Sequence, residues 1–589
     1  MPVFFNGRLW VSPVTASVVD DSRMYNRNLS VGNTLALLGY SEGGENDKVM
    51  RFGTPQEARA LLQSGPLLTA IEKAFSPSNE TGGPAEIVAL RVNKAYPSYG
   101  AITGLVRPIV AGVFQPEATA NLIDIQTTQY GTYTHQYRYK IESGTAVGKK
   151  ITTQFGNEYF VGDNLARNSF SVRYTGSQAT ATCHNVDGRY FVVQAPINTN
   201  LIVVDLVNYP TFAQVVDYLN SFPNIQADLL DSRIGVLANT MDLDWQVDCK
   251  NADYIASADL HAAVDWINGT GEGFITATRA AVAGPGRVLS NCNWTYLKHK
   301  TGEVSATTAS NQEWADAFTR LQQEDVQWVV PITPTAAIHA MCANHCTFMS
   351  DIMRLERRCI VGTDVNTTDD AAILLGQGYN NDRLSLTHLG FYDYGADGKL
   401  KLFEPYYLAA MLGGMFAGVN PGTALTNKSI NVRGLERKLR NPVDTDRLIS
   451  GGVLCVEDTK KGFKVVQSIT TWMTNDNYNR VEVSTGVACD FVMRNWRNAV
   501  DDLRGSKSNP QLLILAAEKT DSILRELSRP EPMGPGVLVG NEENPPYRNI
   551  VVSIEGDVLR IECEASPVIP CNYILLVMHA VPWSGTITK

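Results

Sequence analysis

Three residues with metal-binding side chains lie on one face of a predicted helix. Within 334–353, His339, Cys342 and Cys346 are spaced at i, i+3 and i+7, and Cys359 follows on the next predicted strand. Thiolates and imidazoles are ordinary zinc ligands. However, one helix lacks the Cys-x-x-Cys turn that usually positions two sulfurs, and cysteine is often buried simply as a small apolar residue. We therefore expect core packing here, with no metal ion and no other cofactor.

Sequence patterns for nucleotide binding and metalloprotease chemistry are missing. Residues 144–150 (GTAVGKK) lack the spacing of a phosphate-binding P-loop, and the glycine-rich segment 269–273 is not Gly-x-Gly-x-x-Gly. The His-Glu-x-x-His pair of a zinc protease is also absent. We expect no catalytic residue, no cofactor-binding residue and no enzymatic activity.

Composition places the chain among globular proteins. Its 589 residues are 44% apolar and 19% charged, and 60 acidic against 50 basic residues give a net charge of −10. A mildly acidic chain without a basic block argues against binding to nucleic acid. The mainly apolar stretch 405–419 is shorter than the roughly 18 residues that span a bilayer, so we expect a buried helix and no membrane insertion. Cysteine usage and an N-terminus unlike a signal peptide indicate assembly in a reducing cytoplasm.

The first two hundred residues predict two different units. Segment 21–100 has the pattern of a β-α-α-β unit, with strands at 31–39 and 86–92 and a first helix that Thr54 caps. Segment 101–200 instead favours a separate antiparallel β domain. Its clearest alternation puts four side chains on one face of a strand: Tyr133, Tyr137, Tyr139 and Ile141.

From residue 201 the pattern alternates between strands and helices. We expect strands at 201–206 and 233–238 with a helix between them, then a helix that Ser310 and Glu313 begin as a capping box. Strand 326–332, helix 334–353 and strand 358–362 follow. Such alternation predicts a largely parallel sheet covered by helices, over 201–449.

The remaining segment predicts an α+β domain. We expect a strand at 463–471, a helix at 489–503 and a helix at 510–527 that Asn509 caps. A three-stranded meander should close it, with strands at 549–554, 558–565 and 572–580.

Both ends of the sequence are apolar and nearly uncharged. Residues 1–19 include eleven apolar residues and one basic residue, and 573–589 include ten apolar residues and one charged side chain. Uncharged strand-forming segments invite pairing with another chain, which monomers normally prevent with charges or prolines. The alternative is that both segments join a sheet of their own domain. The candidate inter-subunit residues are Val3, Phe4, Phe5, Leu9, Trp10, Val11, Ile574, Leu575, Leu576 and Val577.

Four short segments resemble one known family. They are Gly65-Pro66-Leu67-Leu68 with 74–75 and 87–92, NPGTALTNKS at 420–429, Gly451-Gly452-Val453 with 465–471, and EASPVIPCNYILLV at 564–577. Their order and spacing resemble the contractile phage tail sheath proteins, which are related to pyocin and type VI secretion sheaths. The matching segments are spread over the chain, but the resemblance skips 101–200 and the loops near 240–310.

The resemblance implies a multidomain α/β and α+β fold with a discontinuous arrangement. Arm 1–20 precedes segment 21–100, which packs with a C-terminal, tube-facing α+β domain at 450–571, and a strand or arm at 572–589 follows. Segment 101–200 is then an inserted β domain. The central domain, 201–449, has a subtilisin-like topology but no subtilisin active site, since the His-Gly-Thr and Gly-Thr-Ser-Met-Ala motifs are absent.

The function implied is that of a structural subunit. Such subunits form sixfold rings stacked helically around the tail tube, and contraction drives the tube through the host envelope. The partners implied are other copies of the chain, the tail tube protein, and the baseplate and tail terminator proteins, in a virion assembled in the host cytoplasm. Two alternatives stay open: an α/β nucleotide-using or hydrolytic enzyme, and another virion component such as a baseplate or adhesin protein.

Overall fold

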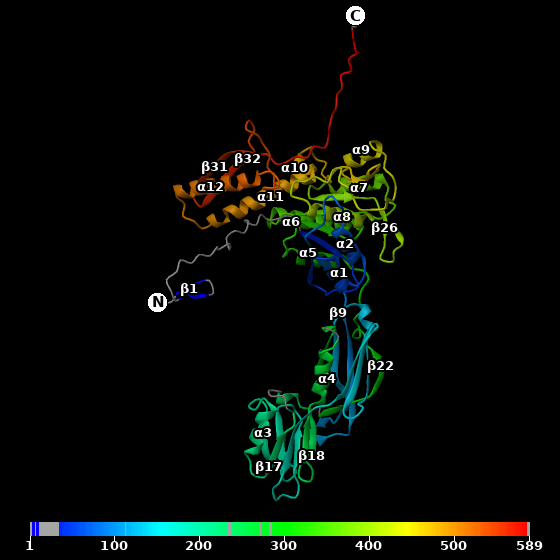
Figure 1. Cartoon of the computed structure of the whole chain (residues 1–589), viewed down its shortest axis with the longest axis vertical. Coiled ribbons are helices and arrows are strands. Elements are labelled where there is room, and N and C mark those ends of the chain that lie inside the picture. Colours follow the sequence, from blue (N-terminus) through cyan, green and yellow to red (C-terminus); the bar gives the residue numbers. More distant parts are fainter. Residues whose placement is uncertain are drawn as a thin grey trace.

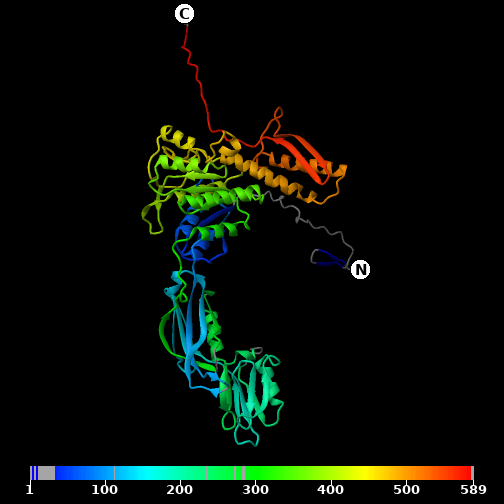
Figure 2. The same cartoon turned by 180° about the vertical axis from the view of Figure 1, so that it is seen from behind.

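The structure, a computed structural model, describes residues 34–111, 113–231, 237–270, 273–281 and 285–585, together with the strand backbones of 3–5 and 8–10. The described chain is elongated (Figures 1 and 2). An α/β unit carries a helical domain on one side and two β-rich modules that extend away one beyond the other. We call these units the body (34–96 and 298–477), the C-terminal domain (478–568), the proximal module (97–166 and 258–297) and the distal module (167–257).

A six-stranded sheet forms the centre of the body. Its order is β25 (Leu384–Thr387), β24 (Arg358–Gly362), β23 (Trp328–Pro331), β3 (Thr34–Gly39), β5 (Glu86–Arg91) and β4 (Val49–Phe52). All neighbours are parallel except β4, which pairs antiparallel with β5. Four of these strands, β3, β5, β23 and β24, were predicted from the sequence, whereas the two outer strands, β4 and β25, were not.

Helices cover both faces of this sheet because its central strands are apolar on both sides. Leu35 and Leu37 belong to the core on one face, whereas Ala36 and Leu38 belong to the core on the other. The first face is covered by α1 (Pro55–Leu62), α2 (Pro66–Phe75) and α8 (Pro405–Gly418). The second is covered by α5 (Asn311–Leu321), α6 (Ala336–Asp351), α7 (Asp369–Tyr379) and α9 (Val443–Ser450).

The body does not end at the boundary expected at residue 450. Val453 forms a parallel bridge to Leu386, and Leu454 and Ile469 belong to the same apolar core as Leu35. The strand expected at 463–471 is shorter, because only β30 (Gly462–Val465) forms, paired with β29 (Val456–Thr459). A small sheet, β27 (Leu400–Phe403), β26 (Phe391–Tyr394) and β28 (Gly434–Leu435), completes the body.

Two antiparallel sheets form the proximal module. One has the order β20 (Ile275–Arg279), β9 (Ala118–Tyr130), β6 (Pro97–Val106) and β21 (Gly286–Leu289). The other has the order β12 (Glu158–Leu165), β11 (Lys149–Phe155), β10 (Arg138–Ser143) and β22 (Cys292–Tyr296). Helix α4 (Asp259–Asn268), the turn η1 (Thr132–Gln136) and the short pair β7 (Ile109–Val110) and β8 (Val113–Phe114) accompany them. The predicted alternation is confirmed from Tyr137 to Ile141, while Tyr133 lies in η1.

The distal module is inserted within the proximal module, between β12 and α4. One of its sheets has the order β17 (Ile225–Leu229), β13 (Asn168–Tyr174) and β19 (Tyr254–Ser257). The other has the order β16 (Asn200–Asp205), β15 (Tyr190–Gln194), β14 (Thr182–Asn185) and β18 (Asp244–Asp248). Helix α3 (Phe212–Asn220) and the turn η2 (Ala238–Thr240) pack with them. A separate apolar core, around Phe170 and Phe191, shows that this module has its own interior.

The parallel α/β unit expected to begin at residue 201 begins about a hundred residues later. The strand predicted at 201–206 is β16, which pairs antiparallel with β15, and most of the strand predicted at 233–238 lies outside the described residues. The β-rich insertion therefore extends from 97 to 297 and not from 101 to 200. The strand-helix-strand pattern misled because hydrophobic periodicity identifies a strand but not its pairing partner.

Two long helices and a hairpin form the C-terminal domain. These are α11 (Val483–Val500), α12 (Pro510–Leu527), β31 (Tyr547–Glu555) and β32 (Val558–Ala565), with the short α10 (Tyr478–Val481) and η4 (Asp501–Leu503). The third strand of the expected meander does not form, since 572–580 pairs with no strand among the described residues. In the part of the chain that the structure describes, no helix combines the length and apolar character needed to cross a bilayer.

Candidate functional site

The segment 573–585, which we call the C-terminal tail, leaves the folded units as an extended strand-like chain without secondary structure. In both views it points away from the body and the C-terminal domain (Figures 1 and 2). Leu575 and Leu576 are each 90% exposed, and Ile574 and Val577 are nearly as exposed. Five consecutive large apolar side chains without cover, Tyr573 to Val577, are unusual in a soluble protein, so this segment is a candidate contact with a partner.

A polar cluster holds Asn572, the residue before the tail, which we call the root of the tail. The Asn572 amide donates to Glu482 Oε2 at 3.2 Å, and Thr426 Oγ1 donates to Asn572 Oδ1 at 3.1 Å. Glu482 is 3% exposed, and it also accepts from Ser468 Oγ at 2.6 Å. Burial raises the pKa of Glu482, although the donors around it favour its carboxylate. The tail is therefore free along its length but anchored where it begins.

The residues around this root come from segments far apart in the sequence. Thr426 belongs to NPGTALTNKS and Ser468 to the segment after Gly451-Gly452-Val453, two of the segments that carry the family resemblance. Glu482 was not among the predicted site residues. A single glutamate outside any motif gives no signal in the sequence. Its role becomes visible only when its four side-chain partners are placed around it: Asn572, Ser468, Gln467 and Ser484.

The N-terminal candidates form a hairpin of their own. β1 (Val3–Phe5) pairs antiparallel with β2 (Arg8–Trp10), with Val3 opposite Trp10 and Phe5 opposite Arg8. Val11 lies outside the described residues. The backbone therefore adopts the strand conformation that pairing with another chain requires, for five of the six candidates named at this end.

An ion network joins α11 to the sheet of the body. Asp490 Oδ2 accepts from Arg358 Nε at 3.0 Å and from Arg383, and both arginine side chains are largely buried. Farther along the helix, Arg494 bonds Asp325 at 2.9 Å and Arg497 bonds Glu356 at 2.6 Å. Charged contacts of this kind fix orientation, and removing one partner of a buried pair is costly.

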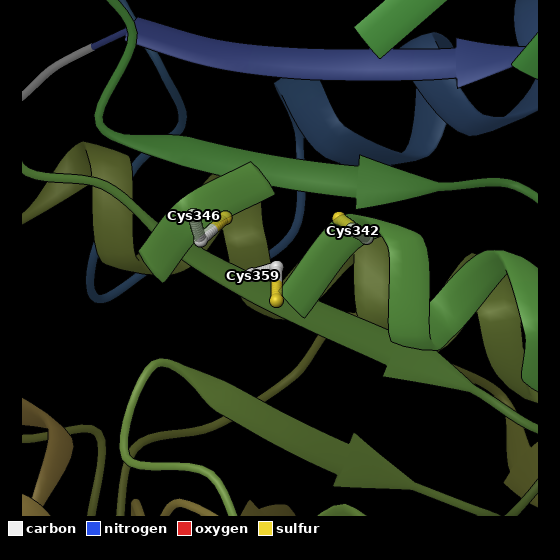
Figure 3. Close-up of side chains that lie close together, drawn as sticks. All are labelled: Cys342, Cys346 and Cys359. Carbon is white, nitrogen blue, oxygen red and sulfur yellow. The ribbon is translucent and has the colours of Figure 1, made fainter. Parts of the chain in front are cut away.

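Three cysteines meet between α6 and the sheet. Cys342 and Cys346 lie one turn apart on α6, and Cys359 lies on the adjacent strand β24 (Figure 3). Their sulfurs lie within 4.8 Å of one another, and each residue is at most 1% exposed. Burial raises the pKa of the Cys342 and Cys359 thiols. The sequence had grouped Cys342 and Cys346 with His339 and offered Cys359 as a fourth member, and the structure places the three cysteines together.

His339 is not part of this cluster. Its Nε2 donates to the Thr333 carbonyl at 2.8 Å, and its Nδ1 lies 2.9 Å from the Tyr379 hydroxyl, which donates to it. Both ring nitrogens are therefore used, and burial lowers the pKa of His339 to about 4. His339 is a neutral structural histidine, and the expected set of weak metal candidates loses its only imidazole.

Two arrangements that resemble catalytic sites were not singled out in the sequence. Residues 39–43 read Gly-x-Ser-x-Gly, beginning at the last residue of β3, but the buried Ser41 hydroxyl donates to the Gly43 carbonyl at 2.9 Å, and Ser41 N donates to Asn93 Oδ1. His388 Nε2 lies 2.8 Å from Asp369 Oδ1, yet its Nδ1 has no hydrogen-bond partner among the described residues. Neither arrangement therefore joins a nucleophile to a base.

The fold is that of solved sheath tail proteins. The chain aligns with the sheath tail protein of Listeria innocua with a TM-score of 0.51, covering 89% of both chains, at 10% identity. It aligns with the sheath tail protein of Desulfitobacterium hafniense with a TM-score of 0.50, covering 88% of this chain and 89% of the other, again at 10% identity. A mixed α/β fold with several sheets, in the class of sheath tail proteins, is thus established.

Sequence relatives extend this likeness to phage proteins. The chain is 27% identical to the tail sheath protein of Bacillus phage SP01 over 607 residues, which covers 100% of this chain and 98% of that protein. It is 25% identical to a putative tail sheath protein of Enterococcus phage phiEF24C, covering 95% of each chain. No family model matches the chain. The resemblance to tail sheath proteins that the sequence predicted is confirmed.

Proposed function

We propose that the chain is the structural subunit of a contractile phage tail sheath, which polymerises helically around the tail tube and contracts to drive it through the host envelope. The observation that carries this function is similarity along the whole chain to proteins named as tail sheath proteins. Because the similarity covers nearly the full length of those relatives, the function refers to the whole subunit and not to one shared domain.

The two apolar segments at the ends of the chain are the proposed links between neighbouring subunits. Strand pairing by the C-terminal tail would give about five main-chain hydrogen bonds at roughly 0.5–1.5 kcal/mol each, besides covering its exposed apolar side chains. A contact that leads from each subunit to the next, without closing on itself, produces a helix. Flexible links of this kind stay attached while larger contacts change during contraction.

Further features of the proposal rest on the resemblance. These features are sixfold rings, a tail tube partner that faces the C-terminal domain, contacts with baseplate and terminator proteins, and a subtilisin-like topology of the body. The subunit acts in the virion after assembly in the host cytoplasm, and it carries out no catalysis. The ion network between α11 and the body supports a C-terminal domain that moves with the body as one piece.

Electron microscopy of the purified chain tests the function directly. We expect the full chain to form long hollow cylinders, and a variant that ends at Asn572 to remain folded but to form none. Discrete particles from the full chain would contradict a sheath subunit. Cylinders of normal length from the shortened variant would contradict only the role of the tail.

A further inference from the structure

The thiol cluster of Cys342, Cys346 and Cys359 has the donor set of a metal site. Among the described residues it is the one group of three histidine, cysteine or acidic side chains whose ligand atoms lie close enough to share an ion. All three come from regular structure, two from α6 and one from β24, so their positions are fixed by the core around them. Figure 3 shows the helix and the strand side by side, with the cysteines at their contact.

The spacing of the sulfurs suits three of the four positions of a tetrahedral zinc site after a small adjustment. A zinc–sulfur bond of about 2.3 Å places the sulfurs of a tetrahedral site about 4 Å apart. The observed spacing reaches 4.8 Å, which rotation of the cysteine side chains reduces without movement of the helix. A core of apolar residues surrounds the cluster and excludes water from it.

A buried cation supplies the charge that such a site needs. Arg357 is 1% exposed and donates to the carbonyls of Leu321 and Glu324 and to the ring of His345, which are uncharged acceptors. Its Nε has no hydrogen-bond partner, and no ion pair of Arg357 occurs within the described ranges. It lies two residues before Cys359, and Cys346, Asp325 and Cys342 attract its charge, whereas the like charge of Arg494 repels it. Buried charges normally have a counter-charge, and Asp325 is too distant to form an ion pair with it.

We propose that Cys342, Cys346 and Cys359 bind one divalent zinc-group cation as three thiolates, with Arg357 as the counter-charge. On binding, each thiol loses its proton to the solvent and forms a metal–sulfur bond. Three thiolates and one divalent cation carry a net charge of −1, which the guanidinium of Arg357 neutralises. The ion ties α6 to β24 and so stiffens the helical layer that covers this face of the sheet.

The burial of the cluster determines how the ion enters. No sulfur is open to solvent, so the ion enters before α6 packs on the sheet, that is, during folding. Adding metal to the folded chain should therefore have little effect. The experiment must supply Zn²⁺ during expression, or Cd²⁺ during refolding of the full chain.

Metal analysis of the full chain tests the proposal. After expression with Zn²⁺ and dialysis against a weak chelator, we expect about one zinc per chain, and X-ray absorption at the zinc edge should show about three sulfur ligands. The Cys346→Ala variant should lose the zinc. Cys183→Ala is the matched control, because it removes a buried thiol from the distal module and should keep the zinc.

A second measurement on the unaltered chain guards against a variant that fails to fold. In denaturant, the number of thiols that react should rise by three when a strong chelator is added. Zinc-free protein, zinc that persists in Cys346→Ala, or a zinc edge without sulfur ligands would each overturn the proposal. The three cysteines would then be ordinary core residues.

Discussion

His339 shows how neighbouring groups set the state of a buried residue. The carbonyl of Thr333 accepts its Nε2 proton, and the hydroxyl of Tyr379 donates to Nδ1. A second proton would have to displace the Tyr379 hydrogen bond in a site closed to water. The ring is therefore held neutral, in agreement with a pKa of about 4.

We predict that this histidine makes the fold sensitive to acid. Its pKa lies near 6.5 in the unfolded chain and about 4 in the folded chain, so between these values the unfolded chain binds the additional proton. Stability should be fully present above pH 6.5 and fall as the pH drops toward 4, by up to about 3 kcal/mol. His339→Gln should remove this part of the loss. Urea midpoints of the unassembled subunit at pH 7 and 4.5 measure it.

The matched control is His579→Gln, which changes an exposed histidine in the C-terminal tail. It should leave the pH dependence of the parent unchanged. Equal pH profiles for the parent and His339→Gln would show that His339 is not held neutral in the fold.

The sequence could place the cysteines but not the histidine. Cys342, Cys346 and Cys359 could be brought together because helical spacing and the following strand are local patterns. His339 shares that helical face, yet Tyr379 comes from 40 residues farther along the chain and takes its free nitrogen. Glu482 was missed for the same reason, since Asn572, the partner that links it to the tail, lies 90 residues farther along the chain.

At the scale of single elements, local signals succeeded where pairing could not be predicted. Ser310 and Glu313 form the expected capping box, and Asn509 accepts from Leu512 N at 2.9 Å at the start of α12. Caps involve residues three apart, so the sequence contains all of the information. Strand pairing is different, because it depends on which other strand of the fold lies beside a segment. The partner of β16 and the unpaired state of the C-terminal tail therefore could not be predicted from those segments alone.

Helix α8 depends on close approach to α2. A Cβ added at Gly414 would lie 2.3 Å from the Ala74 carbonyl oxygen, a backbone atom that cannot move aside. We predict that Gly414→Ala lowers the free energy of unfolding by about 1–3 kcal/mol or more, as overpacked cores do. Gly378→Ala is the matched control, because a Cβ at this site in α7 meets nothing within 4 Å.

Thermal unfolding of the two variants decides this prediction. Gly378→Ala should keep or raise the midpoint, since alanine favours a helix over glycine by about 0.5–1 kcal/mol. If both substitutions had the same effect, contact between α8 and α2 would not be the reason for glycine at position 414.

The docking of α11 on the body should depend on Asp490. Asp490→Ala leaves Arg358 and Arg383 buried without an anion, so we predict a loss of about 3–5 kcal/mol. Asp501→Ala removes an exposed pair with Arg504 and should change stability by less than about 1 kcal/mol. Urea unfolding of both variants measures the difference. A small effect of Asp490→Ala would mean that apolar contacts alone hold the C-terminal domain in place.

At the scale of the whole molecule, one insertion lies inside another. The distal module interrupts the proximal module, which interrupts the body between β5 and α5. Arg167 and Ala258 are adjacent where the distal module begins and ends, because Ala258 N donates to the Arg167 carbonyl at 2.8 Å. An insertion whose two ends lie side by side can be removed and its ends joined without distorting the host fold.

We predict that the distal module is dispensable for folding and assembly. Joining Arg167 to Ala258 through two glycines removes 168–257, and Ala258→Ser replaces the cap that Asp242 gives to α4. The product should be folded and should form cylinders under the electron microscope. A deletion of 103–198 should instead be insoluble, since it separates strands from their partners in both modules. Failure of the first variant to assemble would make the distal module part of the lattice.

The C-terminal tail allows the sharpest test of assembly by strand pairing. Leu575 is 90% exposed, so substitutions there should not disturb the subunit. Leu575→Pro removes a main-chain donor and blocks strand pairing, whereas Leu575→Thr keeps the donor and a strand-forming side chain. We predict that both variants unfold at the same temperature as the parent, but that only the threonine variant forms long cylinders. If the proline variant assembled equally well, the tail would not act by strand pairing, and subunits would be joined through their folded surfaces.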